Sequence, residues 1–109
     1  WEDLRAHTVY NGYTEQSETV QMFWEIVSSL TDAQRSDLLR FVTSVAKPPL
    51  FGFRNLNPPF NISRSFDPNA MPTASTCFNI LKLPDCRNID LLRDRLLTAI
   101  QCSTGFQFS

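Results

Sequence analysis

The 109-residue sequence has no apolar run approaching the roughly 18 residues that a membrane-spanning helix needs. Its opening residues also lack the basic and then apolar pattern of a secretory signal peptide. We therefore expect no membrane partner and a location in the cytoplasm, the nucleus or both. The first residue is Trp1 rather than methionine, so we expect the chain to be a piece of a longer protein.

Charge of a single sign is also missing. The 10 lysine and arginine residues are balanced by 11 aspartate and glutamate residues, which gives a formal net charge of -1. Proteins that bind nucleic-acid backbones or anionic lipids usually carry a strong positive field. We therefore expect no nucleic-acid partner.

Cysteine and histidine are scarce. The three cysteines are Cys77, Cys86 and Cys102, and the only histidine is His7. An odd number of cysteines fits a reducing compartment better than a closed disulfide framework. Neither the cysteine spacings nor the distant histidine resemble the ligand spacing of a structural zinc site. We expect no bound metal.

The remaining composition indicates one globular domain. Hydrophobic residues make up 42% of the chain and charged residues 19%, proportions that favour a folded protein over a disordered one. A chain of this length supports a single modest core. The nine phenylalanines exceed what such a core holds beside its other apolar residues, so we expect some of them at a surface that faces a partner.

Two neighbouring helices are predicted from apolar spacing. Residues 18–29 place apolar side chains at helical intervals, and Ser17 precedes them as a candidate N-cap. The next helix begins at Thr31, whose hydroxyl and Gln34 three residues later form a capping-box pattern. Pro48 ends this helix, because the residue before a proline is pushed out of the helical region.

A third helix is predicted over residues 89–101. Asn88 is its candidate cap, and Gly105 stops any continuation of the helix. Residues 106–109 follow as a short tail that is too apolar for an ordinary unstructured chain end.

Short strands are predicted around residues 8–10, 60–64 and 78–83, where apolar and polar residues alternate. Residues 65–76, which are rich in serine, threonine, proline, asparagine and aspartate, are predicted as a loop. Together, these helices and strands predict an α+β domain, with helices packed on a small sheet and a reactive loop at one edge.

That loop carries the candidate chemistry. Cys77 follows Ser75 and Thr76 at the loop-to-strand junction, where a thiol can be exposed while Phe78 anchors the next position in the core. Backbone N–H groups of such a loop can stabilise a thiolate or a developing oxyanion. Spacing alone favours another interpretation, a small buried hydrophobe, which is the usual state of a cysteine in a small domain.

Residues 71–84, MPTASTCFNILKLP, closely resemble the catalytic-loop signature of HECT ubiquitin ligases. In that signature Leu-Pro, a small residue and Thr-Cys-Phe-Asn precede a Leu-x-Leu-Pro strand. Further blocks resemble the C-terminal lobe of the same family, in the same order along the chain. These blocks are residues 1–4, 8–10, 23–24, 41–44, 49–53 and 104–109.

The resemblance implies that residues 1–109 are the C-terminal lobe of a HECT domain whose N-terminal lobe is absent. Cys77 would accept ubiquitin as a thioester from a ubiquitin-conjugating enzyme, which the missing lobe docks in this family. It would then pass ubiquitin to a lysine of a protein substrate. No cofactor is needed at these steps, because the thioester is already activated.

The resemblance also implies roles for four other residues. Ser75 and Thr76 would orient the loop, and Asn79 would brace the start of the strand. Phe106 stands fourth from the end, where the family places a phenylalanine needed for transfer to lysine. No base for the attacking lysine is assigned.

Ser75 is also the main departure from the family pattern, because many members carry a histidine there. Met71 replaces a leucine, which is a mild apolar change. Two alternatives stay open. A cysteine hydrolase would require a histidine base, which only His7 can supply. A non-catalytic module that binds ubiquitin or another partner would keep Cys77 buried.

Overall fold

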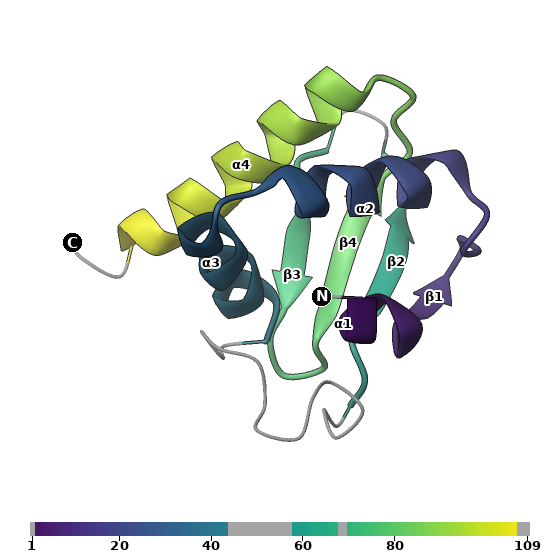
Figure 1. Ribbon diagram of the computed structural model, residues 1–109, viewed down its shortest axis with the longest axis horizontal. Coiled ribbons are helices and arrows are strands. Elements are labelled where there is room, and N and C mark those ends of the chain that lie inside the picture. Colours follow the sequence, from purple (N-terminus) through teal and green to yellow (C-terminus); the bar gives the residue numbers. More distant parts are fainter. Residues whose placement is uncertain (1, 44–57, 68–69, 107–109) are drawn as a thin grey trace.

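The computed structural model describes the backbone of residues 2–43, 58–67 and 70–106, and the side chains of these residues from 3 to 101. Helices and strands alternate irregularly along the chain (Figure 1). They are α1 (Glu2–Ala6), β1 (Val9–Asn11), α2 (Glu18–Ser29), α3 (Asp32–Thr43), β2 (Asn61–Ser65), β3 (Thr73–Ser75), β4 (Ile80–Pro84) and α4 (Ile89–Phe106).

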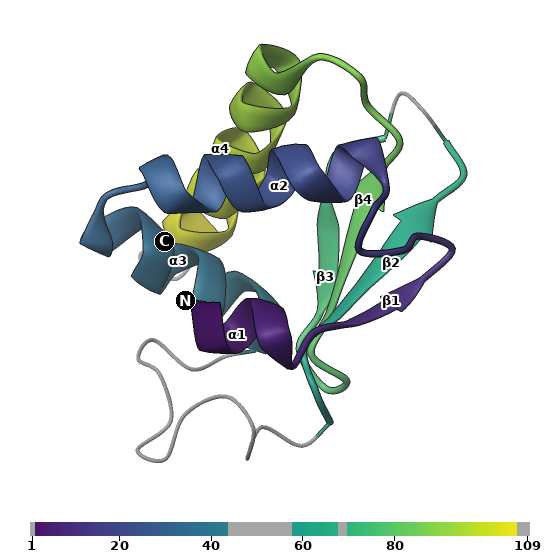
Figure 2. The same ribbon diagram turned by 45° about the vertical axis from the view of Figure 1, so that its right-hand side comes forward.

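The strands form one mixed sheet in the order β1-β2-β4-β3. β1, β2 and β4 run parallel, whereas β3 pairs with β4 in the antiparallel sense and forms one edge. The labelled helices lie together on one side of this sheet (Figure 2). The predicted α+β fold class is confirmed.

The two faces of the sheet differ in what covers them. Ile62 and Leu81 are register partners with no solvent exposure, and they face the helices. Successive side chains along a strand point to opposite faces, so Ser63 and Lys82, which are also partners, lie on the other face. Lys82 is exposed there and Ser63 is half-buried. This second face of the sheet is called the open face below.

Aromatic packing joins the helices to the sheet. Phe23 on α2 is fully buried and meets Trp24 edge-on, with ring centroids 4.9 Å apart. Trp24 lies 6.4 Å from the ring of Phe60, the residue that immediately precedes β2. The indole N–H of Trp24 donates to the hydroxyl of Tyr10 at 3.2 Å. The interior therefore continues from α2 to the lower end of the sheet in Figure 1.

The helix predictions for residues 18–43 are largely confirmed. α2 has the predicted bounds, and α3 begins with the predicted capping box. There, the Thr31 N–H donates to Gln34 Oε1 at 3.0 Å and the Gln34 N–H donates to Thr31 Oγ1 at 3.2 Å. Ser17 occupies the N-cap position but makes no capping hydrogen bond. Its hydroxyl instead accepts from the Thr14 N–H at 2.9 Å, while Pro48 lies outside the described residues.

The cap of α4 is confirmed, but its predicted end is wrong. Asn88 Oδ1 accepts from the N–H groups of Asp90 and Leu91 at 3.0 and 3.3 Å. The helix then continues through Gly105 to Phe106. A glycine inside a helix costs only about 1 kcal/mol, which is less than a buried apolar stripe such as that of α4 can supply. Residues 107–109 of the predicted tail lie outside the described residues.

Two elements are absent from the sequence-based prediction. α1 has only five residues, too few for an apolar period to show. β3 has three residues, Thr73–Ser75, within the segment predicted as a loop. Its side chains are small and mostly polar, so its strand conformation comes from pairing with β4 rather than from intrinsic preference.

Candidate active site

Cys77 lies in the turn that joins β3 to β4, at the lower end of the sheet in Figure 1. The Phe78 N–H donates to the Ser75 carbonyl at 3.2 Å, which closes a β-turn with Thr76 and Cys77 at its centre. The thiol is free and exposed. The predicted exposure of Cys77 is therefore confirmed, and the interpretation as a buried hydrophobe is wrong.

Asn79 fixes the turn to the neighbouring strand. It is 6% exposed and has a φ of 55°, the left-handed conformation that asparagine tolerates better than most residues. Its side-chain Nδ2 donates to the Pro58 carbonyl at 2.6 Å, and its own carbonyl accepts from the Asn61 N–H at 3.0 Å. Main chain and side chain together tie the turn to the start of β2.

Replacing Asn79 should loosen this turn in a graded way. Glycine keeps the left-handed backbone but removes the amide, which should cost about 1 kcal/mol for the lost hydrogen bond. Alanine removes the amide and also strains the backbone, which adds about 1–2 kcal/mol. Urea unfolding of the two variants beside the parent chain measures both steps. Equal stability of Asn79→Ala and Asn79→Gly would contradict the backbone contribution.

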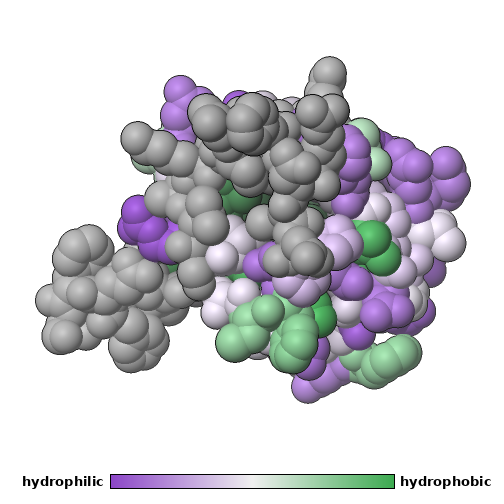
Figure 3. Space-filling model, turned by 90° about the horizontal axis from the view of Figure 1, so that it is seen from below, coloured by the Kyte–Doolittle hydropathy of each residue, from purple (hydrophilic) through white to green (hydrophobic). Residues whose placement is uncertain are grey.

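Phe78 does not anchor the turn in the core, contrary to the prediction. Its side chain is 60% exposed, whereas that of the next residue, Asn79, is buried. The turn reaches the interior through a polar side chain with a defined hydrogen-bond partner. Seen from below, this end of the molecule presents apolar groups among polar ones (Figure 3), and Val9, at the start of β1, is 46% exposed. The exposure of Phe78 agrees with the expectation that some phenylalanines lie at the surface.

The other residues predicted for the site are partly gathered at the turn. Ser75 is half-buried at the end of β3, where it pairs with Ile80. Thr76 is exposed beside Cys77. Phe106 is the last residue of α4 rather than part of an extended tail, and its side chain lies outside the described part of the chain.

His7 is engaged away from Cys77. Its Nδ1 lies 2.9 Å from the Asp3 carbonyl oxygen and 3.3 Å from the Asp3 carboxylate. Among the described residues, no hydrogen bond or ion pair joins His7 to the thiol. The same part of the chain holds no cluster of three or more potential metal ligands. The described geometry supplies no histidine–cysteine pair of the kind that cysteine hydrolases use.

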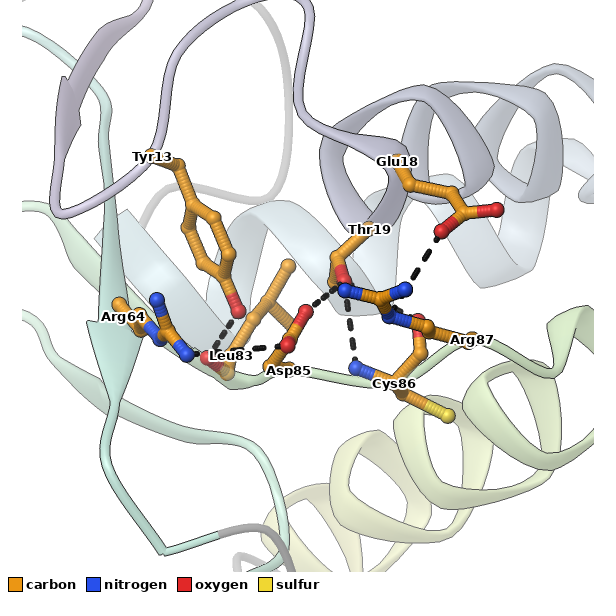
Figure 4. Close-up of polar contacts among 8 residues, drawn as sticks. All are labelled: Tyr13, Glu18, Thr19, Arg64, Leu83, Asp85, Cys86 and Arg87. Atoms are coloured by element: carbon orange, nitrogen blue, oxygen red, sulfur yellow. Dashed lines mark hydrogen bonds and ion pairs between the residues drawn. The ribbon is translucent and has the colours of Figure 1, made fainter.

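Cys86 belongs to a polar network at the opposite end of β4 (Figure 4). The Thr19 hydroxyl lies 2.8 Å from Asp85 Oδ1 and 3.0 Å from the Cys86 carbonyl, and it accepts from the Cys86 N–H at 3.2 Å. Arg64 pairs with Asp85 at 3.7 Å. Burial raises the pKa of Tyr13, and the nearby Asp85 carboxylate raises this pKa further. The network attaches α2 to the carboxyl end of β4 and leaves Cys86 buried.

Asp85 is therefore remote from Cys77, because the whole of β4 separates them. Five strand residues span roughly 16 Å.

Sequence reasoning also missed the partners of Asn79. Pro58 and Asn61 precede it by 21 and 18 positions, and only the pairing of β2 with β4 brings these segments together. No local pattern indicates such a contact.

A family model described as "HECT-domain (ubiquitin-transferase)" matches residues 1–109. The chain belongs to the HECT family. This confirms the resemblance drawn from the sequence. Among curated relatives, a probable E3 ubiquitin protein ligase of Schizosaccharomyces pombe is 46% identical over 110 residues, which cover 99% of this chain and 11% of the relative.

Two further relatives carry similar names. The E3 ubiquitin-protein ligase HUL5 of Saccharomyces cerevisiae is 43% identical over 109 residues, which cover 99% of this chain and 12% of the relative. The E3 ubiquitin-protein ligase RSP5 of Chaetomium thermophilum is 39% identical over 110 residues, which cover 96% of this chain and 13% of the relative. The HECT chain thus spans about an eighth or less of the length of these relatives. Within its described part, no helix is long and apolar enough to cross a bilayer.

Proposed function

We propose that residues 1–109 are the C-terminal lobe of a HECT ubiquitin ligase and that Cys77 carries ubiquitin as a thioester. The observation that carries this proposal is an exposed thiol on a turn fixed to a rigid sheet. The family match and the ligase names of the relatives supply the reaction class.

Two acyl transfers make up the proposed reaction. First, the Cys77 thiolate attacks the carbonyl carbon of the thioester that joins ubiquitin to a conjugating enzyme. The new C–S bond forms as the old one breaks, and the enzyme leaves as a thiolate. Next, a lysine amine of a protein substrate attacks the Cys77 thioester, loses a proton to solvent and releases the Cys77 thiolate. No cofactor takes part.

The shape of the site suits a reaction between large partners. A thiol at the tip of a turn can meet the active cysteine of another protein, which a thiol inside a cleft cannot easily do. Exposed Phe78 beside it offers apolar surface for contact with the incoming protein. We assign orientation of the turn to Ser75 and Thr76, support of the turn to Asn79, and an effect on the lysine step to Phe106.

The proposed partners are ubiquitin, a ubiquitin-conjugating enzyme and protein substrates with an acceptor lysine. The conjugating enzyme would dock on the N-terminal lobe of the HECT domain. The proposed location is the cytoplasm, the nucleus or both.

The decisive experiment is to incubate the full-length ligase with a ubiquitin-charged conjugating enzyme. Non-reducing electrophoresis followed by peptide mapping should give an adduct at Cys77 that a thiol reductant removes. An adduct confined to Cys86 or Cys102 would contradict the assignment.

The His7→Ala variant should form this adduct at the parental rate. His7 contacts Asp3 and not the thiol, so its imidazole has no part in either transfer. Rapid-quench measurement of adduct formation checks this expectation. A strong loss of rate, with stability unchanged, would favour a hydrolase-type mechanism with a histidine base.

A further inference from the structure

Asn11 differs from the other asparagines of the described chain in how its side chain is held. The amides of Asn61, Asn79 and Asn88 all make hydrogen bonds within the domain. Asn11 ends β1 on the open face, where it is the register partner of Ser63, and it is exposed. Its side chain makes no hydrogen bond to another residue of the described ranges. The Asn11 amide can therefore rotate toward its own main chain.

The main-chain nitrogen that follows, that of Gly12, faces away from the sheet. The Val9 N–H donates to the Phe60 carbonyl at 2.9 Å, on the side of β2. Because the N–H groups of successive strand residues point in opposite directions, the Asn11 N–H also faces β2 and the Gly12 N–H faces outward. β1 is a three-residue strand at the edge of the sheet, where local opening costs little free energy. The Gly12 nitrogen is thus within reach of the preceding side chain.

Glycine is the residue type that leaves such a nitrogen most accessible. No other asparagine in the sequence precedes a glycine. Asn61, Asn79 and Asn88 each precede an isoleucine, whose branched and stiff side chain shields the nitrogen next to it. Gly12 also has a φ of 79°, a conformation that glycine adopts without strain. Exposure, a mobile amide and an accessible nitrogen therefore coincide at one pair of residues.

We propose that Asn11 and Gly12 form a site of spontaneous covalent modification, at which the asparagine converts to aspartate and isoaspartate. The Gly12 nitrogen attacks the side-chain carbonyl carbon of Asn11, and the two reacting groups are held together by the chain itself. An N–C bond forms, the bond to the amide nitrogen breaks, and ammonia leaves with the proton of the Gly12 nitrogen. A cyclic succinimide remains. Water then opens this ring at either carbonyl, which gives aspartate or isoaspartate.

The two products should affect the fold differently. Asn11, Gly12, Arg64 and Phe66 line one hollow, and the main chain there is so close that a Cβ added to Gly12 would lie 2.8 Å from the Arg64 Cβ. Isoaspartate lengthens the main chain by a methylene group at this point, so the end of β1 has to move away from β2. Aspartate keeps the main chain and adds only a carboxylate to a hollow lined by an arginine.

The test is incubation of the full-length ligase in mildly alkaline water enriched in the heavy oxygen isotope. Tryptic digestion in ordinary water follows, so that only product formed during the incubation carries the label. We expect labelled aspartate and isoaspartate to accumulate faster at Asn11 than at Asn61, Asn79 or Asn88, which serve as internal controls. Asn11→Gln should abolish the product, because the longer side chain has to close a less favourable ring. Labelling as slow at Asn11 as at the three controls would overturn the proposal.

Hydrogen–deuterium exchange of the aged ligase tests the effect on the fold. Peptides that contain isoaspartate elute apart from the parental ones, so both forms are followed in one sample. The isoaspartate form should exchange the amides of β1 faster than the parent, whereas the Asn11→Asp variant should keep the parental rate. Equal exchange in the isoaspartate and parental forms would contradict the loosening of β1. Both measurements are independent of the ubiquitin reaction, so their failure would leave the proposed function intact.

Discussion

The Cys77→Ala variant of the full-length ligase should lose the ubiquitin adduct and transfer ubiquitin to substrate at least about 1000-fold more slowly than the parent. Losses of this size follow the removal of a nucleophile that forms the covalent intermediate. Cys77→Ser should trap ubiquitin slowly as an oxygen ester that resists a thiol reductant and yields to hydroxide. Electrophoresis with and without reductant separates the two kinds of adduct.

Cys86→Ser is the matched control for this loss. Cys86 is 7% exposed, and its Sγ lies 3.4 Å from the Asn88 carbonyl, so a hydroxyl can take up the same contact. This variant should load ubiquitin at the parental rate. Transfer that survives in Cys77→Ala and disappears in Cys86→Ser would move the reactive thiol to the other end of β4.

The second large effect concerns stability. Phe60→Ala should lower the free energy of unfolding by about 3–5 kcal/mol, as expected for removal of a buried aromatic ring from a packed core. Phe60 is 2% exposed and packs near Trp24. Small domains are stable by only about 5–15 kcal/mol, so this one change removes a large share of the total. Urea unfolding of the 109-residue chain measures it.

Phe66→Ala is the control with the same chemical change. Phe66 is 85% exposed, and its described contact is with the Arg64 guanidinium, 5.7 Å from the ring centroid. Such an exposed contact contributes at most about 1 kcal/mol. A loss in Phe66→Ala as large as that in Phe60→Ala would contradict the assignment of Phe60 to the core and Phe66 to the surface.

The parts of this fold that sequence predicts well are those with local signals. The capping box of Thr31 and Gln34 lies within one helical turn, and the apolar stripe of α2 repeats over residues 18–29. Such signals depend on neighbours three or four positions away. The exposure of Cys77 and the α+β class were also predicted correctly, the former through resemblance to a family rather than through spacing.

The parts that were missed have two causes. Ser17 has the residue type of a helix cap, but the N–H of Thr14, three residues earlier, takes its hydroxyl in a competing local contact. The other cause is contact between distant segments. Phe78 has the residue type of a core anchor, yet the buried position goes to Asn79, whose partners Pro58 and Asn61 come from another strand. Hydrophobicity predicts burial on average, and here a specific hydrogen bond outweighs it.

The double attachment of Asn79 to the start of β2 has a mechanical consequence. A sulfur atom on a freely moving loop could swing between a donor and an acceptor, but the turn that carries Cys77 is attached two residues later, where Asn79 makes a main-chain and a side-chain hydrogen bond to the start of β2. The position of the Cys77 sulfur therefore follows that of the sheet. In the proposed reaction, exchange of one partner for another would call for translation and rotation of the domain as a whole.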